Sequence, residues 1–299
     1  MSKKIIVHIC NKDRPSELAL LLQSLRTQTY KNFNIVILDD GSKTPLTNYY
    51  FIMYMINRLK YEGHGVKIIR NNKPSGVSKA RQQLIDWSLE NGDEDLFARV
   101  DDDVILNKDY LEKLVKVIDE GYDVASGVTT PFINPDMERD IKYVKPIIGY
   151  CELDNEGNIV YMGDECGFGY NKEEIIPAPH FRSCALFKRE VFESGVSYDN
   201  RLSKNGFLEE AILSFKAILK GFKIGVNTKA DARHLMAPSG GMRDTMNLIQ
   251  FNMEMFKETV KKMFEENGDF LDEYYKKLGI DISEINVDYN YQHNLMREK

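Results

Sequence analysis

Strand and helix patterns alternate along the first 130 residues, and this alternation restricts the fold more than any other feature of the sequence. Short apolar runs of the strand type are each followed by a segment with apolar residues at helical spacing. That order is typical of a parallel, doubly wound α/β sheet. The expected strands are 5–10, 33–38, 66–70, one that begins at 97 and closes at the carboxylates 101–103, and 123–129, and the expected helices are 16–29, 47–59, 77–90 and 108–120.

The alternation fails from residue 131 to residue 180. Two strand-like runs, 147–153 and 158–162, flank a turn sequence and predict a β-hairpin. The next segment, 163–170, has the composition of a mobile loop and includes the aromatic residues Phe168 and Tyr170. We therefore expect an insertion at the edge of the sheet that shapes a second binding site. Further elements are expected at 181–187 (re-entry into the sheet), 208–220 (helix) and 223–226 (a short last strand), with His234 in the loop that follows.

The C-terminal part has a different pattern, in which apolar residues step by alternating fours and threes between residues 242 and 263. This spacing predicts a long amphipathic helix with a coiled-coil-like seam, and 269–278 predicts one more helix. Packing across the chain's own domain is the simpler interpretation. A homodimer seam or a membrane-surface contact through 242–264 are the alternatives. We expect a main domain at 1–240, in halves 1–130 and 131–240, and a helical extension at 241–299.

Charge and cysteine content narrow the functional classes. The chain has 299 residues and a formal net charge of -6, which gives no general attraction to nucleic acid. Any anionic ligand must therefore be held by local groups.

The four cysteines show no CxxC spacing and indicate reduced thiols of a cytosolic protein, although a pair between Cys151 and Cys166 stays open. No apolar window is long enough for a signal peptide or a membrane span, which predicts a cytoplasmic location, with peripheral contact at the inner face of a membrane as an alternative.

Three consecutive carboxylates, Asp101, Asp102 and Asp103, follow a hydrophobic run that reads as a buried strand. In an extended segment Asp101 and Asp103 would point to the same side and Asp102 to the other. Their oxygen atoms would suit a hard divalent cation, Mg²⁺ or Mn²⁺. A solvated acidic turn or a helix N-cap is the alternative. The position at the end of a strand favours a ligand site, because ligands of open α/β sheets gather at that edge.

Other polar side chains follow the first two strands and are expected at the same edge. Asn11 and Asp13 leave the first strand, and Asp39 and Asp40 end the second. A carboxylate there can accept hydrogen bonds from N–H or hydroxyl groups of a ligand. The sequence Asp-Asp-Gly-Ser is also a good turn, and that interpretation stays open.

Taken together and in this order, four blocks resemble family 2 glycosyltransferases of the GT-A group. The blocks are VHICNKDRPSELALLLQSLRTQTYKNFNIVILDDGS, NNKPSGVSKAR, RVDDDV and GFLEEAILSFKAILKGFKI, and the resemblance covers roughly residues 3–235. It implies a mostly parallel, Rossmann-like sheet flanked by helices. It further implies that the protein transfers a sugar from a nucleoside diphosphate sugar, with a UDP-sugar as the expected donor, to a carbohydrate or glycoconjugate acceptor. The transfer would invert the anomeric carbon and would need Mn²⁺ or Mg²⁺ as cofactor.

The resemblance also assigns roles to single residues. Glu210 would be the catalytic base, with Glu209 able to share the task, and the family more often has Asp at this place. A base is needed to take the proton from the acceptor hydroxyl during attack. The residues implied to bind the nucleotide are Asn11, Asp13, Asp39, Asp40, Arg81, Asp101 and Asp102, and those implied to bind the metal are Asp103, Asp101 and His234.

The same residues allow simpler interpretations and two rival functions. Arg81 could be an exposed helix residue, and the two glutamates could merely favour a helix N-terminus through its dipole. A nucleotidyltransferase would use a similar sheet and metal, but it would need a glycine-rich, basic loop after the first strand, and 11–15 lacks one. A catalytically silent nucleotide- or carbohydrate-binding relative is the other rival.

Overall fold

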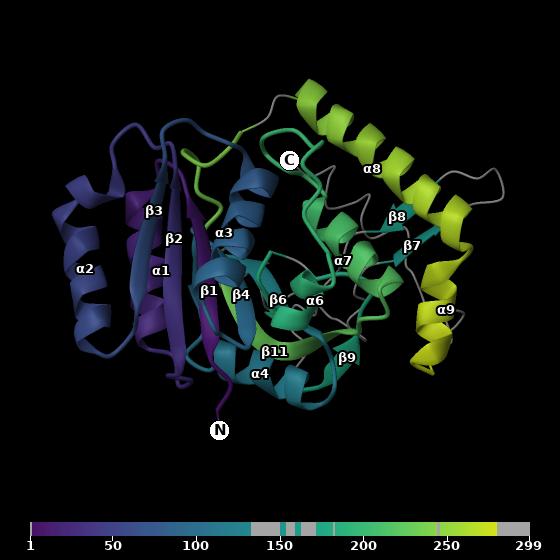
Figure 1. Cartoon of the computed structure of the whole chain (residues 1–299), viewed down its shortest axis with the longest axis horizontal. Helices are drawn as coiled ribbons and strands as arrows, with labels where there is room; N and C mark the ends of the chain where they lie inside the picture. Colours follow the sequence, from purple (N-terminus) through teal and green to yellow (C-terminus); the bar gives the residue numbers. More distant parts are fainter. Residues whose placement is uncertain are drawn as a thin grey trace.

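The computed structural model describes residues 2–132, 150–153, 159–162, 172–181, 183–243 and 246–279. Within these residues nine strands form one sheet in the order β3-β2-β1-β4-β10-β6-β11-β5, with β9 paired to β11 (Figure 1). The bounds are β1 Ile5–Asn11, β2 Phe33–Asp40, β3 Val66–Asn71, β4 Leu96–Asp101, β5 Val104–Leu106, β6 Val124–Pro131, β9 Ile175–Pro177, β10 Ala185–Lys188 and β11 Ile224–His234. Strands β1 to β4 pair in parallel, as do β6 and β11, and these longer ladders confirm the expected α/β sheet, while β5 and β9 pair antiparallel to β11. The re-entering strand β10 is antiparallel to both of its neighbours.

Helices cover both faces of the sheet, because alternate residues of the buried strands face opposite sides and both sides are apolar. One face is covered by α1 Pro15–Arg26, α2 Tyr50–Tyr61 and α4 Tyr110–Asp119. The other face is covered by α3 Val77–Asn91, α6 Arg189–Glu193 and α7 Glu209–Leu219. A short 3₁₀ turn, Leu46–Asn48, precedes α2. Each apolar run of the sequence is therefore buried against a helix.

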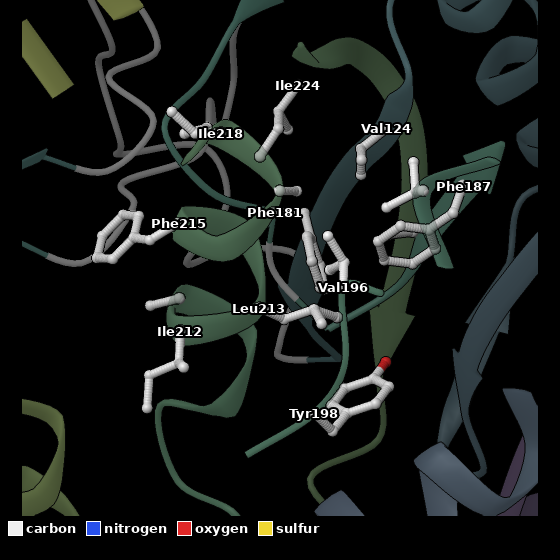
Figure 2. Close-up of a cluster of buried hydrophobic side chains, with 14 of the residues drawn as sticks. Val124, Phe181, Phe187, Val196, Tyr198, Ile212, Leu213, Phe215, Ile218 and Ile224 are labelled. Atoms are coloured by element: carbon white, nitrogen blue, oxygen red, sulfur yellow. The ribbon is translucent and has the colours of Figure 1, made fainter. Parts of the chain in front are cut away.

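The second face carries the core that fixes α7. Figure 2 shows Leu213 and Ile218 of this helix gathered with Val124, Phe187 and Ile224 from three strands. Phe181 packs edge-on against Phe187, with 5.1 Å between the ring centroids. Because these side chains are buried, the start of α7 has a fixed position relative to β4 and β10.

The C-terminal helices α8 Met246–Asn267 and α9 Phe270–Lys277 extend this second core (Figure 1). Of the predicted seam, Phe256, Val260 and Met263 are buried in the same cluster as α7. The hydroxyl of Tyr274 donates to the carbonyl of Ala178 at 3.0 Å and accepts from the amide of Ile224 at 2.9 Å. These buried parts of the seam thus pack within their own chain.

The expected strand that closes at the carboxylates is confirmed, since β4 ends at Asp101; the chain then turns at Asp102 and Asp103 and continues as β5 at the far edge of the sheet. One expectation for the strands was wrong, because the last strand does not end at 226. It runs to His234, because an irregularity after Val226 lets the polar second half pair with β5 and β6. His234 is therefore the last residue of β11 and not part of a loop.

The expected hairpin is confirmed in its pairing, since β7 Tyr150–Leu153 and β8 Ile159–Met162 are antiparallel. Its turn, the loop 163–170 with Phe168 and Tyr170, and Cys166 lie outside the described residues, as does the side chain of Cys151. Each described helix is too short or too polar to traverse a lipid bilayer.

Candidate functional site

The loops at the carboxyl edge of β1, β2, β4 and β11 surround the candidate site. Among the described residues, four that are not glycine have a positive φ, and all lie in or beside these loops or just before β10 and α7: Asp13, Ser183, Leu208 and Met236, with φ between 53° and 69°. A left-handed backbone is unfavourable for a residue with a Cβ, and such residues are concentrated at functional sites. The backbone strain therefore marks the same place as the polar motifs.

Asp101 is the last residue of β4 and is fully paired. One carboxylate oxygen accepts from Arg81 Nη2 at 2.5 Å, and the other accepts from the Ser183 hydroxyl. Burial would raise the pKa of Asp101, but the charges of Arg81 and Arg99 and the hydrogen bond from Ser183 hold it well below its usual range. Asp101 is thus a permanent anion, and Arg81 is not the exposed helix residue of the alternative interpretation.

Asp102 and Asp103 share a partner that the sequence interpretation did not use. Arg14 Nη1 lies 3.0 Å from Asp102 Oδ1 and 2.9 Å from Asp103 Oδ2. Asn11 Nδ2 donates to Asp102 Oδ2 at 2.7 Å. Because the strand ends at Asp101, the alternation of side chains stops there. The expectation that Asp101 and Asp103 point to the same side, with Asp102 opposite, was wrong, since Asp102 and Asp103 turn to Arg14 while Asp101 turns to Arg81.

His234 and Asp103 form the most suitable pair for a cation. His234 Nε2 lies 3.2 Å from Asp103 Oδ1, and this hydrogen bond raises the pKa of His234. Among the described side chains, no group of three or more His, Cys, Asp or Glu is arranged to hold a metal. A carboxylate and an imidazole nevertheless fit Mn²⁺ or Mg²⁺, since such ions usually take few protein ligands and complete their shell with water and phosphate. Of the three predicted ligands, the structure brings together Asp103 and His234 but not Asp101.

The loop after β11 closes against Arg14. Arg14 Nε donates to the carbonyl of Ser239 at 3.1 Å, and the amide of Gly241 donates to the carbonyl of Lys12 at 2.7 Å. Gly240 has φ +71°, and a Cβ on it would lie 2.6 Å from the carbonyl oxygen of Asp13. Only glycine allows this approach, so the Gly-Gly sequence is what lets the loops from two distant strands touch.

The predicted nucleotide-binding carboxylates at the ends of β1 and β2 accept hydrogen bonds from the neighbouring loops. Asp39 accepts from the amides of Ser42 and Leu46 and from Arg70. Asp40 accepts from the amide and hydroxyl of Ser75, the amide of Gly76 and the side chain of Asn71. Asp13 accepts from the amide of Lys43 at 2.7 Å. These bonds fix the loops around the site, whereas direct contact of Asp13, Asp39 or Asp40 with a nucleotide stays a prediction.

Glu209 and Glu210 begin α7 but differ in their surroundings. Glu209 is 2% exposed, and its Oε1 lies 2.8 Å from Arg99 Nη2 and 3.1 Å from Arg81 Nε. The side chain of Glu210 is 28% exposed, and its Oε1 lies 2.8 Å from the same nitrogen of Arg99. Because of these pairs, the glutamates do more than favour the helix dipole. Glu209 is enclosed by two guanidinium groups, while Glu210 keeps access to solvent.

Sequence reasoning missed Arg14, Arg99 and Ser183. Arg99 is buried on β4 beneath Glu209 and Glu210, and its guanidinium lies 5.2 Å from the ring centroid of Phe181. A signal was present, since an arginine in the apolar run FARV is costly unless a carboxylate lies opposite. Arg14 and Ser183 gave no such signal, because both lie in loops where polar residues are ordinary.

Solved GT-A glycosyltransferases have a similar fold. GalNAc-T7 with UDP, GalNAc and Mn²⁺ is 17% identical with a TM-score of 0.58, over 78% of this chain and 44% of that chain. S. aureus TarS 1-349 in complex with UDP is 16% identical with a TM-score of 0.53, over 79% and 61%. Mannosyltransferase PcManGT from Pyrobaculum calidifontis, in complex with GDP-Man and Mn²⁺, is 13% identical with a TM-score of 0.52, over 80% and 58%. At these identities the likeness shows the fold.

The sequence match is more specific. The family model described as glycosyl transferase family 2 matches residues 5–195, well over half of the chain. The chain belongs to this family, and the family and fold together define a glycosyltransferase domain. No curated protein matches the sequence. The chain spans 44% to 61% of the length of the three solved structures compared above.

Proposed function

We propose that the protein transfers a sugar from a UDP-sugar to a hydroxyl group of a carbohydrate or glycoconjugate acceptor, with inversion at the anomeric carbon. One observation carries the proposal. A continuous line of ion pairs joins Asp101 at the end of β4 to Glu210 at the start of α7, through Arg81, Glu209 and Arg99. A carboxylate on the donor side and a solvent-accessible carboxylate on the acceptor side are thereby held at one edge of the sheet.

Glu210 is the base in this proposal. It is the accessible member of the glutamate pair, and it can take the proton from an acceptor hydroxyl that attacks opposite the departing phosphate. Arg99 lies beneath it and fixes the carboxylate orientation through the 2.8 Å contact. Glu209 serves to hold Arg81 and Arg99 in place. We assign the donor side to residues 1–130 and the acceptor side to 131–240.

Asp103 and His234 would hold the divalent cation. When bound, the cation would neutralise charge that develops on the departing nucleoside diphosphate. Two of the three structural relatives compared above contain Mn²⁺. Arg14 already contacts Asp103, so Arg14 would share that carboxylate and add a second positive charge beside the diphosphate.

Asn11 offers the nucleoside an acceptor. Its Oδ1 is buried and has no hydrogen-bond partner within the chain, while its Nδ2 is used by Asp102. An unpaired buried acceptor is costly, and a ligand donor such as the N3–H of uracil would satisfy it. UDP in TarS and GalNAc-T7, and GDP-Man in PcManGT, show that relatives of this fold hold a nucleoside diphosphate.

The decisive experiment separates binding from turnover. UDP and Mn²⁺ should stabilise the protein together, by about 2.7 kcal/mol when UDP is present at about 100 times its dissociation constant. Asp103→Asn should lose the Mn²⁺-dependent part of this stabilisation. Glu210→Gln should keep it but release UDP from a panel of UDP-sugars about 10² to 10⁴ times more slowly, with Glu210→Asp partly active.

Three other results would contradict the proposal. If Glu210→Gln released UDP as fast as the wild type, Glu210 would not be the catalytic base. Stabilisation by UDP with no release of UDP from any sugar nucleotide would favour a silent binding relative. Release of pyrophosphate from a nucleoside triphosphate would favour nucleotidyl transfer.

A further inference from the structure

Helix α2 carries an exposed aromatic face that the proposed function does not use. The three most exposed large apolar side chains among the described residues all lie on it: Tyr61 at 84%, Tyr50 at 78% and Tyr54 at 68%. Phe51 on the same helix is also exposed. The opposite face of α2 is buried through Ile52, Ile56 and Leu59. The helix is therefore fixed to the sheet by one side and presents rings on the other.

These rings form a stripe with an arginine. Positions 50, 54, 58 and 61 follow the i, i+4, i+8, i+11 spacing of a single helix face. The rings of Tyr50 and Tyr54 have centroids 6.5 Å apart, and the guanidinium of Arg58 lies 5.6 Å from the ring centroid of Tyr61. Stacked tyrosines with a cation among them present apolar area and hydrogen-bonding groups at the same surface.

The charge of this region is opposite to that of the rest of the chain. Residues 43–73 contain six basic residues and one acidic residue, a net charge of +5, whereas the whole chain carries -6 and the remainder therefore carries -11. The basic residues are Lys43, Arg58, Lys60, Lys67, Arg70 and Lys73, and the acidic one is Glu62. Arg70 is paired with Asp39 and Arg58 with Glu62, so the attraction to an anionic surface comes mainly from the four lysines. The segment includes α2 and β3, which is the edge strand of the sheet, so these charges belong to one end of the molecule (Figure 1).

We propose that the α2 face, meaning Tyr50, Phe51, Tyr54 and Tyr61 with the cations of 43–73, docks the protein on the surface of an anionic lipid bilayer. Tyrosine rings are favoured at the boundary between hydrocarbon and headgroups, and clustered Lys and Arg are attracted to anionic headgroups. An ionic polymer would be recognised by the cations alone. It would leave the exposed rings without a function.

Helix α8 provides a matched comparison. It also exposes apolar side chains, namely Leu248, Phe251 and Met253. Its residues 246–267 contain three basic and four acidic residues, a net charge of -1. Apolar exposure without net positive charge gives little attraction to anionic lipid, so α8 serves as the control surface, and a membrane contact through 242–264 stays a prediction.

The test is co-sedimentation of the full chain with vesicles of phosphatidylcholine containing about one third phosphatidylglycerol, and with pure phosphatidylcholine. The wild type should bind the anionic vesicles and not the neutral ones. Lys60→Gln with Lys67→Gln should weaken the partition about 25-fold, since each cation contributes about five-fold. Tyr50→Ser with Tyr54→Ser and Tyr61→Ser should weaken it at least ten-fold. The α8 variant Leu248→Ser, Phe251→Ser, Met253→Ser should bind as the wild type does.

Three outcomes would overturn the proposal. The first is no binding of the wild type to anionic vesicles. The second is that the tyrosine variant binds anionic vesicles as strongly as the wild type does, and that both proteins also bind polyphosphate equally well. The surface would then recognise negative charge alone, without a contribution from the rings. The third is a dimer in solution that the tyrosine variant converts to a monomer, because the face would then be a protein interface. Unfolding midpoints of all variants should equal that of the wild type, since the substituted side chains are exposed.

Discussion

Glu209 and Glu210 are adjacent in the sequence, yet substitution of Glu209 should lower the stability of the fold, whereas substitution of Glu210 should lower turnover. Glu209→Gln removes the carboxylate that pairs with both buried guanidinium groups, those of Arg81 and Arg99. Breaking a buried ion pair on one side costs about 3–5 kcal/mol. In this variant Arg81 is still paired with Asp101 and Arg99 with Glu210. We therefore expect a loss of stability at the lower end of this range, about 3 kcal/mol.

Glu210→Gln should cost about 1 kcal/mol or less, because this carboxylate is partly exposed and has one ionic partner. Its effect should fall on turnover instead. Urea unfolding followed by the fluorescence of Trp87, the single tryptophan, would measure both variants. For Glu209→Gln the thermal midpoint should fall by roughly 5–10 °C.

The reasoning would be refuted if Glu209→Gln were as stable as the wild type, because the line of ion pairs would then contribute nothing. It would also be refuted if Glu209→Gln folded normally and lost turnover as Glu210→Gln does. In that case the buried glutamate, and not the accessible one, would act on the acceptor.

Three further predictions concern pH and the C-terminal helices. Burial lowers the pKa of His8 to about 3, below its unfolded value of about 6.5, so the stability that neutral His8 contributes is complete above pH 6.5 and is lost as the pH falls. Between pH 7 and pH 5 the wild type should lose about 2 kcal/mol more than His8→Gln in urea unfolding, and parallel curves would argue against this. The hydrogen bond to Asp103 raises the pKa of His234, and because a protonated imidazole cannot bind a cation, the thermal stabilisation by Mn²⁺ should shrink on acidification from about pH 8 to about pH 6. His234→Ala should abolish that pH dependence. Tyr274→Phe should destabilise the fold by about 1–3 kcal/mol through the bonds lost to Ala178 and Ile224, with Tyr61→Phe as the neutral control.

The sequence determined the elements whose burial is encoded locally. Apolar runs of five or six residues and leucines at helical spacing predicted β1, β2, α1 and the long α8, because each needs only its own pattern to show which face is buried. The polar residues that end β1, β2 and β4 predicted the edge where the site lies, because parallel strands bring their carboxyl ends together.

Tertiary structure alone decided which of these side chains pair. The turn after Asp101 sends β5 to the far edge of the sheet, and no local pattern shows where the apolar run after the carboxylates pairs. Arg14 reaches Asp103, and Arg99 reaches Glu210 over 111 positions of sequence, since the sheet order places these elements side by side. A buried charge needs an opposite charge, so the sequence shows that Arg99 must have a partner. Only the fold determines which carboxylate it is.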